Sequence, residues 1–409
     1  MSVIPKGERI NICFIGKTNV GKSTIINKLI GQEISIVSEQ AGTTTDPVVK
    51  RFEIPAIGTV SIFDTAGYDD VSSIGEKRIA AMKKVLYRTD LAVVVLDERG
   101  QCDIDNVYID LLNALKIPYI VVCNKADLNT CNIPDCIPTS IKNDDWRSML
   151  LDTIVEKILS QREPEKSILE GLVKPNDKII MVMPIDSSAP KGRIILPQVQ
   201  VLREILDKHA VALCCSDKEL TSVLTNMKEP PNLVITDSQV INFVAKTVPE
   251  EFLLTTFSIL FSRYKGELEP FMSGLSVLKD LKDGDTVLIA EACSHHAMDE
   301  DIGTVKIPKW LQEYLGINLV FTKVNGHDFP EDLEKNKLVI HCGGCMLSRV
   351  EMLRRINECQ LRGVPITNYG MLISKVFGSL DRVTAFNSPS KVNCRDVASY
   401  VQKCYNSPL

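Results

Sequence analysis

Short apolar runs alternate with amphipathic helical stretches from Ile10 to about Leu159. The apolar runs are INICFIG, VSIFDTAG, LAVVVLDE and YIVVCNKAD, and each has the length and composition of a β-strand. Strands that alternate with helices predict a mostly parallel sheet that is covered by crossover helices. We therefore predict that residues 1–162 form one α/β domain.

The same alternation returns twice after a charged linker, SQREPEKS, in which Pro164 discourages continuation of a helix. Strands IIMVMPI, AVALCC and LVITD, with the helix QVQVLREILDKH, predict a second unit over residues 163–266. Strands TVLIAEAC, NLVFTKV and KLVIHCGG, with the helix SRVEMLRRINECQLRG, predict a third unit over residues 267–409. The predicted fold class is α/β in three domains, with two smaller α/β units following the first.

Composition narrows the class of protein. A chain of 409 residues is too long for one ordinary core, and 44% hydrophobic with 24% charged residues is typical of a globular protein. The net charge of −5 argues against a large nucleic-acid-binding face, and no apolar run is long enough to cross a membrane. Thirteen cysteines, an odd number in a long chain without a secretion signal, predict a cytoplasmic protein rather than a disulfide scaffold.

A phosphate-binding loop is predicted at GKTNVGKS, Gly16 to Ser23, which follows a strand and opens a helical run. Gly16 and Gly21 let backbone N–H groups surround phosphate oxygens, and Lys22 adds a positive charge at the β- and γ-phosphates. The Ser23 hydroxyl is the predicted Mg²⁺ ligand, and Thr24 beside it belongs to the same nucleotide site.

Two further motifs stand in the expected order. DTAG ends a strand, so Asp64 can hold Mg²⁺ through water while the Gly67 N–H meets the γ-phosphate. NKAD, Asn124 to Asp127 with Lys125 between them, also ends a strand, and the Asp127 carboxylate can accept both N–H donors on the edge of guanine.

Ser140, in SIK, fits the loop that closes over the base. Together with the phosphate loop, these motifs predict a P-loop domain that hydrolyses GTP with Mg²⁺.

Two positions bear on the rate of hydrolysis. Thr44, in AGTTTDP, is the best candidate to sense Mg²⁺ and the γ-phosphate, and we group it with Lys22, Asp64 and Gly67 as catalytic residues. Tyr68 follows DTAG where many GTPases carry a glutamine that orients water. Because tyrosine lacks the amide, slow intrinsic turnover is predicted, which suits a timer.

Thiols and imidazoles gather in two loops of the third unit. EACSHH and HCGGC each end an apolar strand, giving C-x-H, a long spacer and H-C-x-x-C. Loops at the carboxyl ends of strands meet in such folds, so Cys293, Cys342 and Cys345 are expected to converge. Buried inert cysteines, a structural zinc site and a three-cysteine iron–sulfur cluster all fit these residue types, and spacing does not separate zinc from iron.

The combination of GKTNVGKS with AGTTTD resembles the TrmE–Era group of GTPases. In the members of that group that use potassium, the residue matching Asn19 and carbonyl groups of the first switch bind K⁺. The resemblance therefore implies a K⁺ site at Asn19 and potassium-stimulated hydrolysis. The alternative is that Asn19 only forms hydrogen bonds within its loop.

The whole chain, in its domain order and its CSHH and HCGGC motifs, resembles the FeFe-hydrogenase maturation GTPases of the HydF family. This resemblance implies a 4Fe–4S cluster on Cys293, Cys342 and Cys345, with His295 and His341 as further ligands or their neighbours. It also implies a homodimer, formed through the middle domain, that takes a precursor of the two-iron subcluster from two radical-SAM maturases to apo FeFe-hydrogenase.

A second interpretation remains open at this point. Related GTPases modify RNA or assemble ribosomes, and such a protein could carry a structural zinc at the thiol loops. The acidic balance and the lack of a basic run with interleaved aromatic residues argue against it.

Overall fold

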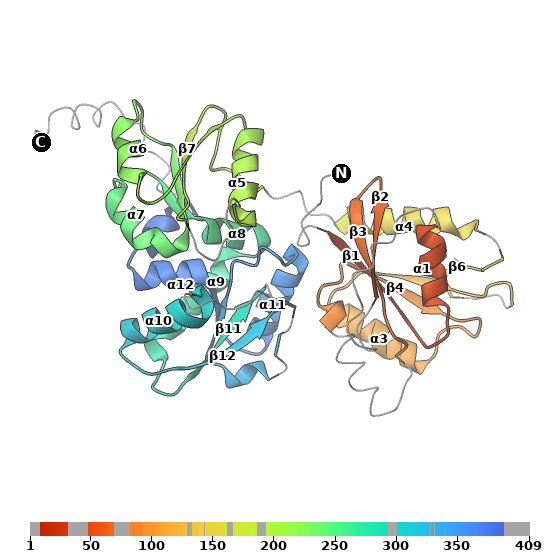
Figure 1. Ribbon diagram of the computed structural model, residues 1–409. Coiled ribbons are helices and arrows are strands. Elements are labelled where there is room, and N and C mark those ends of the chain that lie inside the picture. Colours follow the sequence, from red (N-terminus) through yellow and green to blue (C-terminus); the bar gives the residue numbers. More distant parts are fainter. Residues whose placement is uncertain are drawn as a thin grey trace, which may run out of the picture. The chain divides into compact units, whose positions relative to one another are not determined.

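The computed structural model describes residues 9–31, 48–68, 82, 84–128, 133–142, 144–161, 167–185, 194–292, 301–327, 329–330 and 332–387. The chain divides into two compact units, residues 1–165 and residues 166–409 (Figure 1).

The first unit is built on one sheet. Its strands are β1 (Ile10–Gly16), β2 (Val48–Ile54), β3 (Gly58–Asp64), β4 (Leu91–Leu96), β5 (Tyr119–Cys123) and β6 (Ile137–Pro138). Among the described residues they lie in the order β2-β3-β1-β4-β5-β6, and only the β2–β3 pair is antiparallel. The described helices of this unit are α1 (Lys22–Ile30), α3 (Asp103–Ala114) and α4 (Trp146–Gln161).

Alternation of side chains along the central strands gives this sheet two buried faces. Ile12 and Phe14 of β1 pack in one apolar cluster with residues of α1 and α4. Cys13 and Ile15 pack in the opposite cluster with residues of α3. Because both faces are covered, β4 is buried along its whole length, which explains its unbroken apolar sequence LAVVVL.

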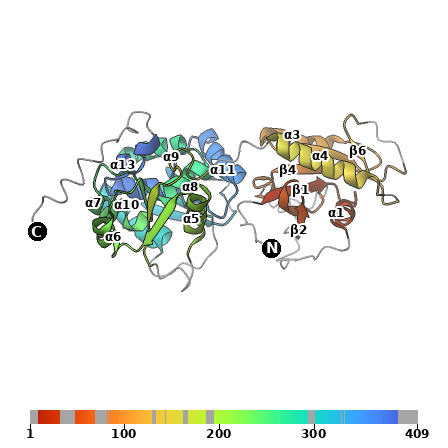
Figure 2. The same cartoon turned by 90° about the horizontal axis from the view of Figure 1, so that it is seen from above.

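The second unit contains two parallel sheets. The first of them holds β7 (Lys178–Val182), β8 (Val211–Cys215), β9 (Leu233–Thr236) and β10 (Leu254–Thr256), in the order β10-β9-β7-β8. Figure 2 shows its strands between α5 (Leu196–Asp207) on one side and α6 (Leu220–Asn226) with α7 (Ile241–Thr247) on the other. Helix α8 (Phe257–Lys265) follows β10 directly.

The other sheet holds β11 (Thr286–Glu291), β12 (Val320–Asn325), β13 (Leu338–His341) and β14 (Ile366–Asn368), in the order β12-β11-β13-β14. The larger helices around it are α9 (Leu268–Gly274), α10 (Ile307–Leu315), α11 (Arg349–Leu361) and α12 (Tyr369–Val376), followed by the short α13 (Leu380–Val383). A π-helix spans Ile302–Lys306, and short 3₁₀ helices span Ser238–Val240, Leu275–Asp280, Leu333–Lys335 and Ala385–Asn387.

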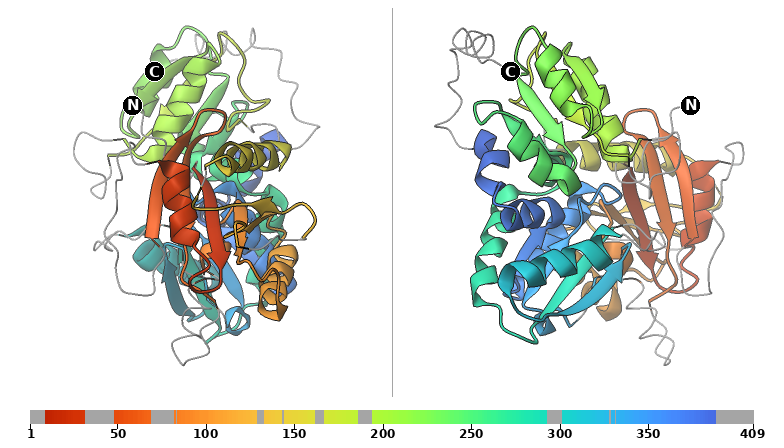
Figure 3. Two further views of the ribbon diagram at one scale, coloured as in Figure 1. Left: turned by 90° about the vertical axis from the view of Figure 1, so that its right-hand side faces the viewer. Right: turned by 60° about the vertical axis from the view of Figure 1, so that its left-hand side comes forward.

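One apolar core joins these two sheets. It includes Ile180 and Val234 from the first sheet and Val287 and Ile340 from the second. Helix α8 packs against α11 and α12, so helices of both sheets lie between them (Figures 1 and 3). The carboxyl end of α8 thereby lies close to the loop that follows β13.

The predicted α/β fold class is confirmed, with a mostly parallel sheet followed by two parallel α/β units. Within the residues that the structure describes, no helix has the length and apolar character to span a membrane. Cys123 is disulfide-bonded, although the sequence analysis predicted no disulfide scaffold.

Candidate functional site

The phosphate loop lies between β1 and α1, where the motif predicted it. Gly21 has φ 97°, and a Cβ atom there would lie 2.2 Å from Nδ2 of Asn124, so this position requires glycine. Lys22 Nζ donates hydrogen bonds of 2.8 Å to the carbonyl oxygens of Gly16 and Lys17. The ammonium group is therefore held over the loop, where phosphate oxygens would meet it.

The remaining residues of the loop are accessible. Ser23 and Thr24 are exposed in the first turn of α1, and Asn19 is exposed with a left-handed φ of 60°. Their hydroxyl and amide groups are thus open to a ligand at the start of the helix, where backbone N–H groups lack helical partners.

The DTAG segment lies against this loop. Asp64 ends β3 and pairs in register with Phe14 of β1. Thr65 Oγ1 donates a hydrogen bond of 2.7 Å to the Phe14 carbonyl oxygen. A Cβ at Gly67 would lie 2.2 Å from Thr18 Oγ1, so only glycine allows the two loops to approach so closely. Gly67 therefore lies against the phosphate loop and Asp64 ends the strand beside β1, while their contacts with the γ-phosphate and Mg²⁺ stay predictions.

The base-binding segments are tied to the same loop. Asn124 Nδ2 donates a hydrogen bond of 2.7 Å to the Val20 carbonyl oxygen, and Asn124 Oδ1 accepts a hydrogen bond of 3.2 Å from Thr139 Oγ1. The Asp127 carboxylate accepts a bond of 2.7 Å from Ser140 and pairs with Lys142 Nζ at 2.8 Å. These contacts, from Lys142 first and then Ser140, lower the pKa of Asp127 and keep its carboxylate ionised.

Lys125 occupies the left-handed region with φ 59°, and its Nζ lies 3.4 Å from Glu98 Oε2. Its backbone therefore makes the sharp turn between Asn124 and Asp127.

The side chain that follows DTAG turns toward α3. Tyr68 is 5% exposed, its hydroxyl donates to Asp105 Oδ1, and its ring stacks on Tyr108 with centroids 4.1 Å apart. Burial, followed by the contact with Asp105, raises the pKa of Tyr68. Tyr68 is thus a buried contact between the DTAG loop and α3.

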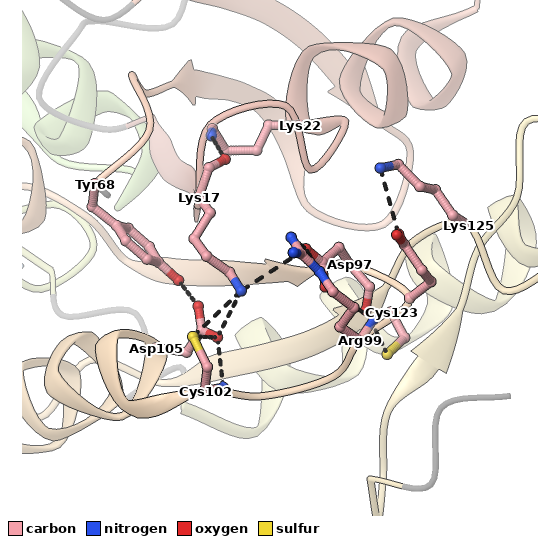
Figure 4. Close-up of polar contacts among 10 residues, drawn as sticks. Lys17, Lys22, Tyr68, Asp97, Arg99, Cys102, Asp105, Cys123 and Lys125 are labelled. Atoms are coloured by element: carbon pink, nitrogen blue, oxygen red, sulfur yellow. Dashed lines mark hydrogen bonds and ion pairs between the residues drawn. The ribbon is translucent and has the colours of Figure 1, made fainter. Parts of the chain in front are cut away.

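A network of charges connects the phosphate loop to the same helix (Figure 4). Lys17 Nζ lies 3.6 Å from Asp105 Oδ2, 3.9 Å from Asp97 Oδ2 and 3.3 Å from Cys102 Sγ. Burial opposes the charge of Lys17, but the contacts with Cys102, Asp105 and Asp97 outweigh it and raise the Lys17 pKa. Sequence reasoning missed this network; the signal was Asp105, a carboxylate on the buried side of an amphipathic helix.

The second candidate site is the thiol loop, residues 342–348 between β13 and α11. Cys342 Sγ accepts backbone N–H bonds from Ala292, at 3.1 Å, and from Gly344, at 3.4 Å. Burial raises the pKa of Cys342 to about 11. Burial also raises the pKa of Cys345, although the charge of Lys265 opposes this.

The thiol loop is tied to α8, the helix that follows the first sheet of the second unit. Lys265 is the last residue of α8, and its Nζ donates a hydrogen bond of 3.0 Å to the Leu347 carbonyl oxygen. Arg349 Nη1 donates to the carbonyl oxygens of Tyr264, at 3.2 Å, and Gly266, at 2.8 Å. These tertiary contacts had no sequence signal.

His341 is fully buried beside the loop, and both its ring nitrogens have partners. Nδ1 lies 2.8 Å from the Cys342 carbonyl oxygen and Nε2 lies 2.9 Å from Arg355 Nη1. Burial, followed by the charge of Arg355, lowers the pKa of His341 to about 3. The imidazole is therefore neutral.

Several predicted site residues lie outside the described residues, namely Thr44, Cys293 and His295. Among the side chains that the structure does describe, no group of three or more His, Cys, Asp or Glu residues is arranged to hold a metal ion. The expected convergence of Cys293 with Cys342 and Cys345 thus stays a prediction.

Three family models match the chain. Residues 11–125 match a model described as a 50S ribosome-binding GTPase. Residues 168–266 match the hydrogen maturase F dimerization domain, and residues 269–386 match the hydrogen maturase F tetramerization domain.

Individual relatives match part of the chain. GTPase Der of Wolinella succinogenes is 38% identical over 125 residues, which are 30% of this chain and 26% of the relative. GTPase Der of Clostridium botulinum is 28% identical over 230 residues, which are 55% of this chain and 46% of the relative. The chain thus spans less than half the length of these curated relatives.

Among solved structures, a variant of Aquifex aeolicus Era bound to GDP.AlF4- is 21% identical and covers 50% of this chain and 92% of its own. The TM-score of this match is 0.31.

Proposed function

Because the chain belongs to the hydrogen maturase F (HydF) family, we propose that it is a scaffold or carrier for the two-iron subcluster precursor of FeFe-hydrogenase. Its first unit is a P-loop GTPase domain related to Der, and its second unit consists of the two self-association domains of the family. Receipt of the precursor from two radical-SAM maturases and delivery to apo-hydrogenase are the roles that the proposal adds.

The contacts of the nucleotide site support slow, Mg²⁺-dependent GTP hydrolysis. Lys22 would exchange its carbonyl partners for β- and γ-phosphate oxygens, and Ser23, Asp64 and Thr44 would hold Mg²⁺. Tyr68 contacts α3 through its hydroxyl and therefore supplies no group to orient water. The exposed Asn19 would hold K⁺, which places positive charge where other GTPases use an arginine.

The observation that carries the cluster proposal is the 3.1 Å bond from the Ala292 N–H to Cys342 Sγ. Cys293 follows Ala292 in the chain, and consecutive Cα atoms are about 3.8 Å apart. We therefore propose that Cys293, as the next residue of the chain, joins Cys342 in binding the cluster.

The donor set also fits an iron–sulfur cluster. N–H bonds to a cysteine sulfur, such as those that Cys342 accepts from Ala292 and Gly344, stabilise the thiolate and tune the potential of a cluster. The positive charge of Lys265 acts on Cys345 in the same direction. Cys293, Cys342 and Cys345 would hold the cluster. A 4Fe–4S group bound by three thiolates keeps one iron with an exchangeable position, which suits a carrier.

Iron and sulfide analysis of protein purified without oxygen tests the proposal. We expect a brown protein with a 4Fe–4S signal in electron paramagnetic resonance (EPR), which activates apo-hydrogenase after incubation with both maturases. Cys342→Ser should lose the cluster, whereas Cys102→Ser, at an exposed cysteine of the first unit, should keep it. A colourless protein that binds zinc and refuses iron after reconstitution would rule the carrier role out.

Coupling between the two sites is a further part of the proposal. Ordering of the switch loops by the γ-phosphate would change their contacts with partner proteins. The K⁺-stimulated GTPase rate should therefore change when either maturase is added. An unchanged rate with both maturases would count against coupling.

The ribosome-related function remains the second candidate, because the model that matches residues 11–125 is described as ribosome-binding. That match covers only the first unit. Co-sedimentation with ribosomal subunits, together with bound zinc, would favour this second function over the carrier role.

A further inference from the structure

The hydrogen bonds of His341 determine which of its ring nitrogens carries the proton. Arg355 Nη1 lies 2.9 Å from Nε2, and a guanidinium group can only donate, so Nε2 must be the acceptor. The Cys342 carbonyl oxygen lies 2.8 Å from Nδ1 and can only accept, so Nδ1 must carry the proton. Both partners together require one tautomer, neutral with Nδ1–H.

Arg355 is itself held in a fixed position. It is 1% exposed, and its side chain is the largest fully buried one among the described residues. Its Nη2 donates to the Gly326 carbonyl oxygen at 2.8 Å and to Glu351 Oε1 at 3.1 Å, and its guanidinium lies 5.3 Å from the centre of the Phe329 ring. Burying a guanidinium is costly unless its donors are satisfied, so this arrangement stabilises one orientation of Arg355.

The chain of contacts continues to the surface. Glu351 is 2% exposed, and both its carboxylate oxygens lie 3.0 Å from His327 Nδ1. The His327 side chain is 43% exposed. His327, Glu351, Arg355 and His341 thus form a continuous series, the positioning series, from solvent to the backbone of Cys342.

The series ends where the geometry of the thiol loop is set. His341 holds the Cys342 carbonyl group, and Cys342 Sγ accepts the N–H of Gly344. Gly344 has a left-handed φ of 64°, and a Cβ there would lie 2.3 Å from Met352 Cε on α11. Helix α11 therefore supports the loop both by packing and through Arg355.

We propose that Arg355, oriented by Glu351, is a positioning residue that holds His341 as its neutral Nδ1–H tautomer, so that His341 orients Cys342 and does not bind the metal. This proposal rests on the proposed function in that Cys342 is taken to be a cluster ligand. It assigns roles to Arg355, Glu351 and His327, which no sequence motif indicated.

A ligand role for His341 would require the opposite arrangement. Coordination through Nε2 would displace Arg355, and coordination through Nδ1 would remove the donor to the Cys342 carbonyl oxygen. Either change would leave a buried polar group without its partner, which is unfavourable.

The tautomer can be measured directly on the full-length, metal-free protein. With ¹⁵N-labelled histidine, long-range proton–nitrogen correlation spectra distinguish Nε2, which couples to both carbon-bound ring protons, from Nδ1. The chain has five histidines, and His341→Asn identifies the signals of His341. We expect an unprotonated Nε2 and a protonated Nδ1. A protonated Nε2 would overturn the proposal, whatever metal the protein binds.

The loaded protein gives an independent test. Loss of a residue that orients a metal ligand typically weakens metal binding about 10- to 100-fold. Arg355→Met should accelerate iron release to a chelator by a factor in that range, and Arg355→Lys, which keeps one donor, should lie between it and the unmodified protein. Arg362→Met is the matched control, because Arg362 directly follows the last residue of the same helix but pairs with Glu358 and Glu334.

Pulsed EPR of the reduced cluster completes the test. A nitrogen coupling of a directly bound imidazole that disappears in His341→Asn would contradict the proposal, as would equal iron release from Arg355→Met and Arg362→Met. If the protein takes up no iron–sulfur cluster, the proposed function fails, while the tautomer measurement on metal-free protein still decides the role of Arg355.

Discussion

Asp127 shows how one carboxylate can be prepared for recognition of guanine. Its oxygens accept bonds from Ser140 and Lys142, and these contacts lower its pKa. A carboxylate that must accept two N–H donors has to be ionised, so GTP affinity should follow the ionised fraction of Asp127.

This gives a prediction about pH. The pKa of Asp127 in the folded protein is depressed, so its carboxylate stays ionised as the pH falls past the ordinary carboxyl pKa. GTP binding should therefore fade only as the pH falls through the depressed value. Lys142→Met removes the largest cause of the depression, so binding should begin to fade at a higher pH than in the unmodified protein. Calorimetric titrations with GTP across the acid range would measure this. Identical pH profiles for the two proteins would contradict it.

Tyr68 permits a prediction that separates stability from catalysis. Tyr68→Phe keeps the stacking on Tyr108 but removes the hydroxyl that donates to the buried Asp105. Loss of a donor to a buried carboxylate should lower the free energy of unfolding of the first unit by about 1–3 kcal/mol. The rate of GTP hydrolysis at saturating GTP should not change, because the hydroxyl is bonded to α3.

Urea denaturation and phosphate release would measure the two effects on one preparation. A large fall in hydrolysis with unchanged stability would show that Tyr68 acts on the nucleotide instead.

At the residue scale, the sequence could point to Lys22, Asp64, Gly67 and Asp127 because each belongs to a short motif whose geometry is local, and their roles toward GTP and Mg²⁺ stay predictions. Asp105 and Arg355 could not be predicted in the same way. Asp105 is 37 residues from Tyr68, and Arg355 is 14 residues from His341, so their roles exist only in the folded chain.

At the scale of elements, the thiol loop is shaped by the strand before it and the helix after it. β13 ends at His341, and Ser348 begins α11 by accepting the N–H of Glu351 at 3.2 Å. Between them, Gly344 alone has a left-handed backbone, whereas a Cβ added at Gly343 would meet no atom within 4 Å. The two adjacent glycines therefore have different structural roles.

These glycines offer a matched pair of substitutions. Gly344→Ala imposes left-handed strain of roughly 1–2 kcal/mol and places a Cβ against Met352, so the thiol loop should shift and the protein should retain less iron after reconstitution. Gly343→Ala meets open space and should retain as much iron as the unmodified protein. Iron content per chain is the measurement, and equal losses in both variants would contradict this account of the loop.

The predicted elements agree with the structure where the apolar pattern was strong. The helix predicted over residues 198–209 spans Leu196–Asp207, and that predicted over residues 348–363 spans Arg349–Leu361. The attachment of the thiol loop to the end of α8 was not predictable, because Lys265 and Arg349 bond to backbone carbonyl oxygens, which carry no residue identity.

At the scale of the whole molecule, the second unit has an apolar edge suited to self-association. Among the described strands β8 lies at the edge of its sheet, with Val211 50% and Leu213 36% exposed. α5 packs beside it and exposes Val199 and Leu206. An exposed apolar edge strand is a site where a second chain can pair.

We therefore predict that Leu213→Asp reduces self-association. A charge on this edge would be buried unpaired in a dimer, so the molar mass measured by light scattering should fall toward that of smaller species. Val107→Asp is the control, since Val107 is 63% exposed on α3 of the first unit. If Leu213→Asp leaves the molar mass unchanged while Val107→Asp lowers it, the interface lies elsewhere.

The sequence predicts the order of the three sheets along the chain, but it predicts only part of the chain's self-association. A homodimer was inferred from resemblance, and the match to a tetramerization domain over residues 269–386 adds a higher assembly that no pattern of residues had indicated.

The most direct test of the account is the cluster content of Cys293→Ser. Reconstituted without oxygen, the unmodified protein and Cys102→Ser should each carry a full complement of iron and sulfide and give the same EPR signal. Cys293→Ser should lose that signal, as Cys342→Ser does. A Cys293→Ser protein with undiminished iron and an unaltered signal would contradict the account, because Cys293 would then not bind the cluster.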